Sequence, residues 1–168
     1  YLTAATDHKL VDGPMKGRTG CDICLSSATL WAPAIRTDLF AQTYRPAIDG
    51  GMIEQFALYT LTDQVERSDC CVGIYSKSLL YLISNALEEV AHVPVRRPHG
   101  QPLLGMEYFV QNDPDLLNLF EQENADWVLS PNDHPEKTVA AARAQSHPQF
   151  DERVTLASTA RRILGAGG

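Results

Sequence analysis

Residues 55–62 read Gln55-Phe56-Ala57-Leu58-Tyr59-Thr60-Leu61-Thr62, and an acid, Asp63, follows them directly. The run is rich in aromatic and apolar residues, which fit the pleated and buried surface of a sheet. The sequence therefore predicts a β-strand here that ends at Asp63.

Two other apolar runs have the length of strands. Residues 27–32 form a run that Pro33 stops, as expected of a strand buried on both faces of a parallel sheet. Residues 127–129 are closed by Ser130-Pro131-Asn132 and are predicted to be the third strand. Helices are predicted at residues 37–43, from a cap at Ser76 through Val90, at 113–120 and at 151–164, and the segment between Asp63 and Ser76 is predicted to be a polar loop.

The alternation of strands and helices predicts an α/β fold with a mostly parallel sheet and right-handed crossovers. Residues 94–105 contain three prolines and two glycines and are predicted to be a long surface loop. Three strands are few for a sheet that helices cover on both faces. We therefore expect residues 1–168 to be a single domain or the C-terminal part of one, with further strands upstream or on another chain.

Composition excludes several classes of partner. The net charge of −7 argues against binding to nucleic acid, which requires clustered Lys and Arg. No stretch approaches the roughly 18 apolar residues of a membrane span. We expect a soluble, cytoplasmic protein, although the start at Tyr1 leaves a removed signal peptide open.

Metal and cofactor sites are not expected. The four cysteines occur as Cys21-x-x-Cys24 and as the adjacent pair Cys70-Cys71, and adjacent cysteines point to opposite sides of the chain. We interpret them as reduced core residues rather than as zinc ligands. No two histidines have a ligand spacing with a nearby acid, so neither a metal nor another cofactor is predicted.

The order of the elements resembles the C-terminal portion of an α/β-hydrolase, whose catalytic triad runs nucleophile, acid, histidine along the chain. Residues 28–34 resemble the strand and Ala-Pro-Ala-like turn that follow the nucleophile helix. Residues 58–63 resemble the strand that delivers the acid, and residues 146–151 resemble the histidine turn before the terminal helix. The resemblance, closest to bacterial members without an assigned substrate, extends over nearly the whole chain.

The resemblance implies that Asp63 is the triad acid and that His147 is the base. Asp63 would hold one ring nitrogen of His147, which would then move protons during acyl transfer. Glu66 and Asp69 follow in the same segment and remain alternatives for the acid. For the base, His134 remains the alternative, although its setting between prolines is that of an ordinary turn.

The nucleophile is not in this sequence. The Gly-x-Ser-x-Gly elbow of the family is absent, and Ser76, in its nearest approach, follows the acid and is interpreted as a helix cap. We therefore expect a serine-type hydrolase of ester or amide bonds whose nucleophile lies in a missing N-terminal portion of the same fold, with a small-molecule or peptide acyl substrate. The alternative is a non-catalytic, hydrolase-like scaffold for binding or assembly, in which Asp63 and His147 lie apart and are satisfied locally.

Overall fold

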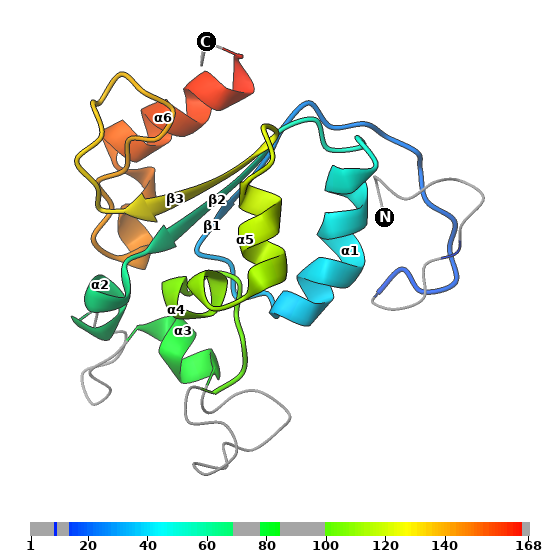
Figure 1. Ribbon diagram of the computed structural model, residues 1–168, viewed down its shortest axis with the longest axis horizontal. Coiled ribbons are helices and arrows are strands. Elements are labelled where there is room, and N and C mark those ends of the chain that lie inside the picture. Colours follow the sequence, from blue (N-terminus) through cyan, green and yellow to red (C-terminus); the bar gives the residue numbers. More distant parts are fainter. Residues whose placement is uncertain (1–8, 10–13, 69–77, 85–99, 166–168) are drawn as a thin grey trace.

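The strand β2 (Phe56–Leu61) is the middle strand of a three-stranded, all-parallel sheet of order β1-β2-β3. Its neighbours are β1 (Ala28–Trp31) and β3 (Ala125–Ser130), and helices lie on both sides of the sheet in this computed structural model (Figure 1). The structure describes residues 9, 14–68, 78–84 and 100–165. The predicted α/β class and parallel sheet are confirmed at this level.

All six residues of β2 are buried, and they divide between the two faces of the sheet. Phe56 and Leu58 belong to one apolar cluster, while Ala57, Tyr59 and Leu61 belong to another. A strand buried in this way shows no alternation of polar and apolar residues, which is why it reads as a continuous apolar run.

Three helices lie on the Phe56 face: α1 (Thr37–Asp49), α4 (Glu107–Gln111) and α5 (Pro114–Phe120) (Figure 1). Phe40 from α1 packs against Phe56 with ring centroids 5.5 Å apart. The predicted start of α5 is confirmed, because the carboxylate of Asp113 accepts hydrogen bonds from the amides of Asp115 and Leu116.

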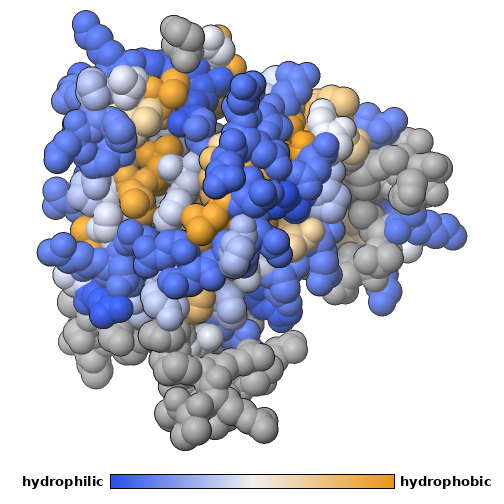
Figure 2. All heavy atoms as spheres, in the orientation of Figure 1, coloured by the Kyte–Doolittle hydropathy of each residue, from blue (hydrophilic) through white to orange (hydrophobic). Residues whose placement is uncertain are grey.

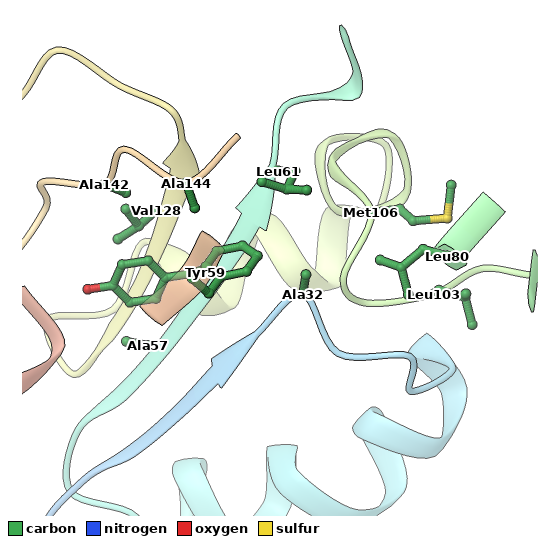
Figure 3. Close-up of a cluster of buried hydrophobic side chains, with 11 residues drawn as sticks. Ala32, Ala57, Tyr59, Leu61, Leu80, Leu103, Met106, Val128, Ala142 and Ala144 are labelled. Atoms are coloured by element: carbon green, nitrogen blue, oxygen red, sulfur yellow. The ribbon is translucent and has the colours of Figure 1, made fainter. Parts of the chain in front are cut away.

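The Tyr59 face is covered by the 3₁₀ helix η2 (His147–Asp151) and by α6 (Arg153–Ile163). The Tyr59 ring lies beside Ala57, Val128 and Ala144 in the second cluster (Figure 3). Its hydroxyl is 2.9 Å from the hydroxyl of Ser158 in α6. This buried bond joins the middle strand to the last described helix.

Hydrophilic residues predominate on the face shown in Figure 2, with apolar residues in separate patches between them. In the described part of the chain, no helix is both long enough and apolar enough to span a membrane.

Several boundaries differ from the sequence-based predictions. The helix α1 continues past Pro46 to Asp49, because Ala47 and Ile48 are buried in the apolar cluster with Phe40 and hold the last turn in place. Within the predicted surface loop 94–105, Leu103 and Leu104 are buried and pack in the two clusters, so the prediction was wrong for this part.

Two short helices account for other differences. The helix α2 (Asp63–Ser68) occupies a segment that was predicted to be a loop. The helix α3 (Leu79–Leu82) has Ser78 as its N-cap, two residues after the predicted cap. Ser76 and the rest of that predicted helix from residue 85 onward lie outside the described residues, as do residues 1–6.

Candidate functional site

The carboxyl ends of β2 and β3 lead into the two segments that carry the candidate residues. Thr62 extends the ladder by donating its amide to the carbonyl of Ser130 at 2.8 Å, and α2 begins directly after it. The hydroxyl of Ser130 in turn donates to the carbonyl of Ala144 at 2.8 Å. The loop that leaves β3 is thus tied back to the end of the sheet shortly before His147.

Asn132 fixes the shape of this loop. Its side-chain nitrogen donates to the carbonyls of Leu129 at 2.7 Å and Ala140 at 2.8 Å, and its oxygen accepts from the amide of Ala142. The oxygen also accepts from the amide of His134, as in an ordinary turn. His134 is exposed, so the loop places it in solvent and brings His147 back to the sheet.

His147 forms a pair with Glu66 at this end of the sheet. Its Nε2 lies 3.1 Å from Oε1 of Glu66, across 81 positions of sequence. The side chain of His147 is 23% exposed, whereas that of Glu66 is 1% exposed. The pair therefore presents an accessible imidazole in front of a carboxylate that water does not reach.

Burial strengthens the electrostatic interaction of the Glu66 carboxylate with its neighbours. Oε2 of Glu66 has no hydrogen-bond partner within the described residues. The hydrogen bond of the Glu66 side chain in this part of the chain is therefore the one between Oε1 and His147. An interaction between a carboxylate and an imidazolium is stronger in such surroundings than in water. A carboxylate of this kind can orient the ring and stabilise its protonated form.

Asp63, the predicted acid, has other partners. Its carboxylate accepts a hydrogen bond of 2.5 Å from the hydroxyl of Tyr81 and pairs with Arg67 at 2.7 Å. In the described part of the chain, no hydrogen bond or ion pair joins Asp63 to His147. The structure thus brings His147 to Glu66, one of the two alternatives for the acid, rather than to Asp63.

Helix geometry explains the difference. The sequence predicted a loop after the strand, in which the residue nearest the strand would reach the histidine. The six residues Asp63–Ser68 instead form α2, and Asp63 lies in its first turn beside Arg67 at i+4. Glu66, one turn later, is buried and meets His147.

One aromatic ring contacts His147, and a second ring stacks on the first. Phe150 lies in an edge-to-face arrangement with its imidazole, with ring centroids 6.4 Å apart. Trp31, from the carboxyl end of β1, stacks on Phe150 at 6.2 Å between ring centroids and is 36% exposed, whereas Phe150 is buried. A row of aromatic contacts therefore runs from the histidine to the end of β1, where Trp31 is partly open to solvent.

A cavity of about 360 Å³ lies at the opposite end of the sheet. Residues from the amino ends of the strands line it, together with Arg162 of α6. The guanidinium of Arg162 is already engaged by the carboxylate of Asp126 and the carbonyl of Val139. This cavity is separate from the histidine site and holds none of the predicted catalytic residues.

The structure describes only some of the cysteines, histidines and acids considered from the sequence. Cys21 and Cys24 are exposed and free, so the interpretation of these two as core residues was wrong. Among the described residues, no group of three or more His, Cys, Asp or Glu side chains could hold a metal ion. Cys70 and Cys71 lie outside the described residues, as do Asp69, His8, His92 and His99.

A local signal for α2 was present in the sequence. Thr62-Asp63 is followed by Glu66 at a spacing of three from the acid, which is the signature of a helix start. The amide of Glu66 donates to the carbonyl of Thr62 at 2.9 Å, as a helix requires. This spacing indicates a helix with two candidate acids one turn apart.

Comparison with known proteins assigns no family to this arrangement. No protein-family model matches the chain, and no curated protein or solved structure matches it either. The chemistry of the site therefore rests on the contacts of His147 and Glu66 described above.

Proposed function

We propose that this chain is the acid-bearing and histidine-bearing portion of a serine-type hydrolase that cleaves an ester or amide bond. The observation that carries the proposal is the 3.1 Å contact between Nε2 of His147 and Oε1 of Glu66 beyond the carboxyl ends of parallel strands. In parallel sheets this is the end at which functional side chains gather. Glu66 takes the role that the sequence had assigned to Asp63.

In this scheme His147 carries the proton. A hydroxyl is a weak nucleophile until a base within hydrogen-bond reach removes its proton. His147 takes that proton as the oxygen attacks the acyl carbon, and returns it to the leaving group when the carbon–leaving-group bond breaks. Water then enters by the same route and releases the acid product. Glu66 stabilises the imidazolium in both steps.

The orientation of the His147 ring determines which of its nitrogens is proposed to exchange the proton. Because Nε2 of His147 lies on Glu66, Nδ1 is the nitrogen left to exchange a proton with the nucleophile. This reverses the usual triad arrangement, in which the acid holds Nδ1.

The nucleophile is proposed to come from a missing N-terminal portion of the same fold. β1 is an edge strand, and a further parallel strand can pair with it there. Trp31 at its carboxyl end leads through Phe150 to the histidine. A strand added at this edge would end near His147, where a nucleophile on the following turn is needed.

The exposed ring of Trp31 favours an acyl substrate with an apolar group. Trp31 is the accessible end of the aromatic row that leads to His147, and aromatic side chains supply large apolar contact areas. Anionic substrates such as nucleic acid are not favoured by a chain with a net charge of −7.

The test uses the full-length protein with a p-nitrophenyl ester as the probe. We expect His147→Asn to lower kcat by at least about 10³-fold, because the base is lost, and Glu66→Gln to lower it by about 10²-fold or more. His134→Asn is the matched control and should leave kcat unchanged. Loss of activity in the control with retention in His147→Asn would contradict the proposal, as would an upstream sequence without a Ser, Cys or Asp elbow.

The non-catalytic scaffold remains the second candidate because of one observation. Asp63 is satisfied locally by Tyr81 and Arg67, as that alternative predicts. Under the scaffold hypothesis, Glu66 and His147 are likewise a structural pair. A fluorophosphonate probe separates the two hypotheses: covalent labelling that requires His147 favours the hydrolase, and absence of labelling in the folded full-length protein favours the scaffold.

A further inference from the structure

We propose that Tyr81 and Asp63 form a positioning device that holds α2 in the place where Glu66 meets His147. The inference rests on the proposed function, since it assigns a purpose to the environment of that pair. It gives Asp63 a role that acts through Glu66 rather than on the histidine directly.

The starting point is the length of α2. The helix has six residues, and isolated helices shorter than about 12–15 residues are marginal in water. Contacts with the rest of the fold must therefore hold it. Its buried carboxylate, Glu66, can stay on His147 only while those contacts fix the helix.

Tyr81 supplies one such contact from α3. Its hydroxyl donates to Oδ1 of Asp63 at 2.5 Å, and Nε of Arg67 donates to the same hydroxyl at 3.3 Å. Arg67 also pairs with Oδ2 of Asp63 at 2.7 Å. Three side chains thus close a small network over the outer side of α2.

A second contact lies on the backbone. The amide of Ser78 donates to the carbonyl of Glu66 at 3.0 Å, and the Ser78 hydroxyl accepts from the amide of Tyr81 at 3.4 Å. Ser78 is fully buried. The start of α3 is thereby attached to Glu66. The Tyr81 hydroxyl is attached to Asp63, the first residue of α2.

A third contact holds the beginning of α2. The amide of Asp63 donates to Oε2 of Glu107 in α4 at 2.5 Å. The residues Asp63, Glu66 and Arg67 are therefore all engaged by side chains or backbone from other helices. Of these contacts, the Tyr81 hydroxyl bond can be removed by deleting one oxygen atom without changing the shape of the side chain.

Tyr81→Phe in the full-length protein is the main test, and Asp63→Asn is the second variant. The direct measurement is the NMR signal of the His147 imidazole N–H in ¹⁵N-histidine-labelled protein. We expect that signal to broaden or shift in both variants, because the contact with Glu66 is loosened. The same change in kind should appear in Glu66→Gln, which removes the carboxylate itself.

Activity provides a second readout. A displacement of the order of 1 Å can cost about 10²-fold in rate, so we expect kcat to fall by about 10-fold to 10²-fold with little change in KM. The double variant should lose less than the sum of the two single losses, since both substitutions weaken the same network of Tyr81, Asp63 and Arg67. Tyr44→Phe is the matched control, because Tyr44 stacks on Phe40 in α1, away from this network.

The proposal is overturned if Tyr81→Phe and Asp63→Asn both fold and leave the His147 signal as it is in the unaltered protein. A failure of the proposed function looks different: Glu66→Gln would then retain full kcat. The NMR measurement does not depend on catalysis, so it still decides whether Tyr81 and Asp63 position the pair.

Discussion

The hydroxyl of Tyr59 lies 2.9 Å from the hydroxyl of Ser158, and this bond between the middle strand and α6 is buried. The Tyr59 oxygen also donates to the carbonyl of Val139 at 3.2 Å, and Nε of Arg162 approaches it at 3.3 Å. A single oxygen atom therefore connects the sheet, the loop after β3 and the last described helix.

Replacing this tyrosine with phenylalanine should destabilise the protein. Tyr59→Phe removes the shared oxygen and leaves buried polar groups of Ser158 and Arg162 without it. We expect the free energy of unfolding to fall by about 1–3 kcal/mol. Urea denaturation followed by circular dichroism measures the change, with Tyr44→Phe as the control. A loss no larger than that of the control would contradict the assignment of this bond as a stabilising one.

Gly105 has no room for a side chain. An added Cβ would lie 2.5 Å from the carbonyl carbon of Ala32 and 2.6 Å from the carbonyl oxygen of Pro33. Both are backbone atoms, which cannot rotate away as a side chain can. We expect Gly105→Ala to cost about 1–3 kcal/mol through overpacking.

The control for this variant is Gly17→Ala, since nothing lies within 4 Å of a Cβ there, although its positive φ of 81° adds backbone strain. Thermal unfolding compares the two. Gly105 is not among the described glycines with a positive φ, so a loss no larger than that at Gly17 would contradict the overpacking against Ala32 and Pro33.

Glu152 caps α6 and makes part of its stability dependent on pH. Its carboxylate accepts from the amides of Val154 at 2.7 Å and Thr155 at 2.5 Å. Burial alone would raise the pKa of Glu152, but the hydrogen bonds from Thr155 and these amides outweigh it and leave the pKa below its usual value. The stabilisation is therefore complete above the ordinary pKa of 4.5 and is lost as the pH falls through the lower folded value.

We expect Glu152→Ala to reduce the free energy of unfolding by about 1 kcal/mol at neutral pH, because the cap is lost. The difference from the unaltered protein should shrink in acid, where the Glu152 carboxylate is protonated. Denaturation at neutral and acidic pH measures both values. A difference that stays constant with pH would contradict the role of the charged form.

Tyr81 has the opposite pH dependence. Burial and the hydrogen bond to Asp63 raise the pKa of Tyr81 to about 12, from 10.0. The folded state thus retains a proton that the unfolded chain has already lost, so this contribution to stability is present below pH 10 and disappears between pH 10 and 12. We expect Tyr81→Phe to lose less stability than the unaltered protein over this interval, as measured by denaturation at both ends of it.

The parts of the fold that were predictable from sequence are those that local patterns determine. The run at residues 55–62 is rich in aromatic and apolar residues because β2 is buried on both faces, and the cap at Asp113 predicts the start of α5. By contrast, α2 is short and polar, and contacts with residues distant in sequence hold it, so its composition predicted a loop and only the spacing of Asp63 and Glu66 indicated a helix start. The same holds for the last turn of α1, where burial of Ala47 and Ile48 outweighs the effect of Pro46.

The candidate site was predictable in its location but not in its pairing. His147 and the segment after β2 were both identified, since acids and histidines that follow parallel strands converge on one end of the sheet. Which of Asp63 and Glu66 meets His147 depends on the rotation of α2 about its own axis. Tyr81 and Glu107, which lie on other helices, contact the first residue of α2, and no local pattern connects them to the histidine.

The position of α6 has a consequence for biosynthesis. Ser158, Thr159 and Arg162 in this helix bond to Tyr59, Trp31 and Asp126, which belong to three different strands. The Tyr59 side of the sheet therefore stays open to water, and to chaperones, until the ribosome has released this helix. Nascent chains halted before residue 153 should bind a chaperone, and completed ones should be freed from it.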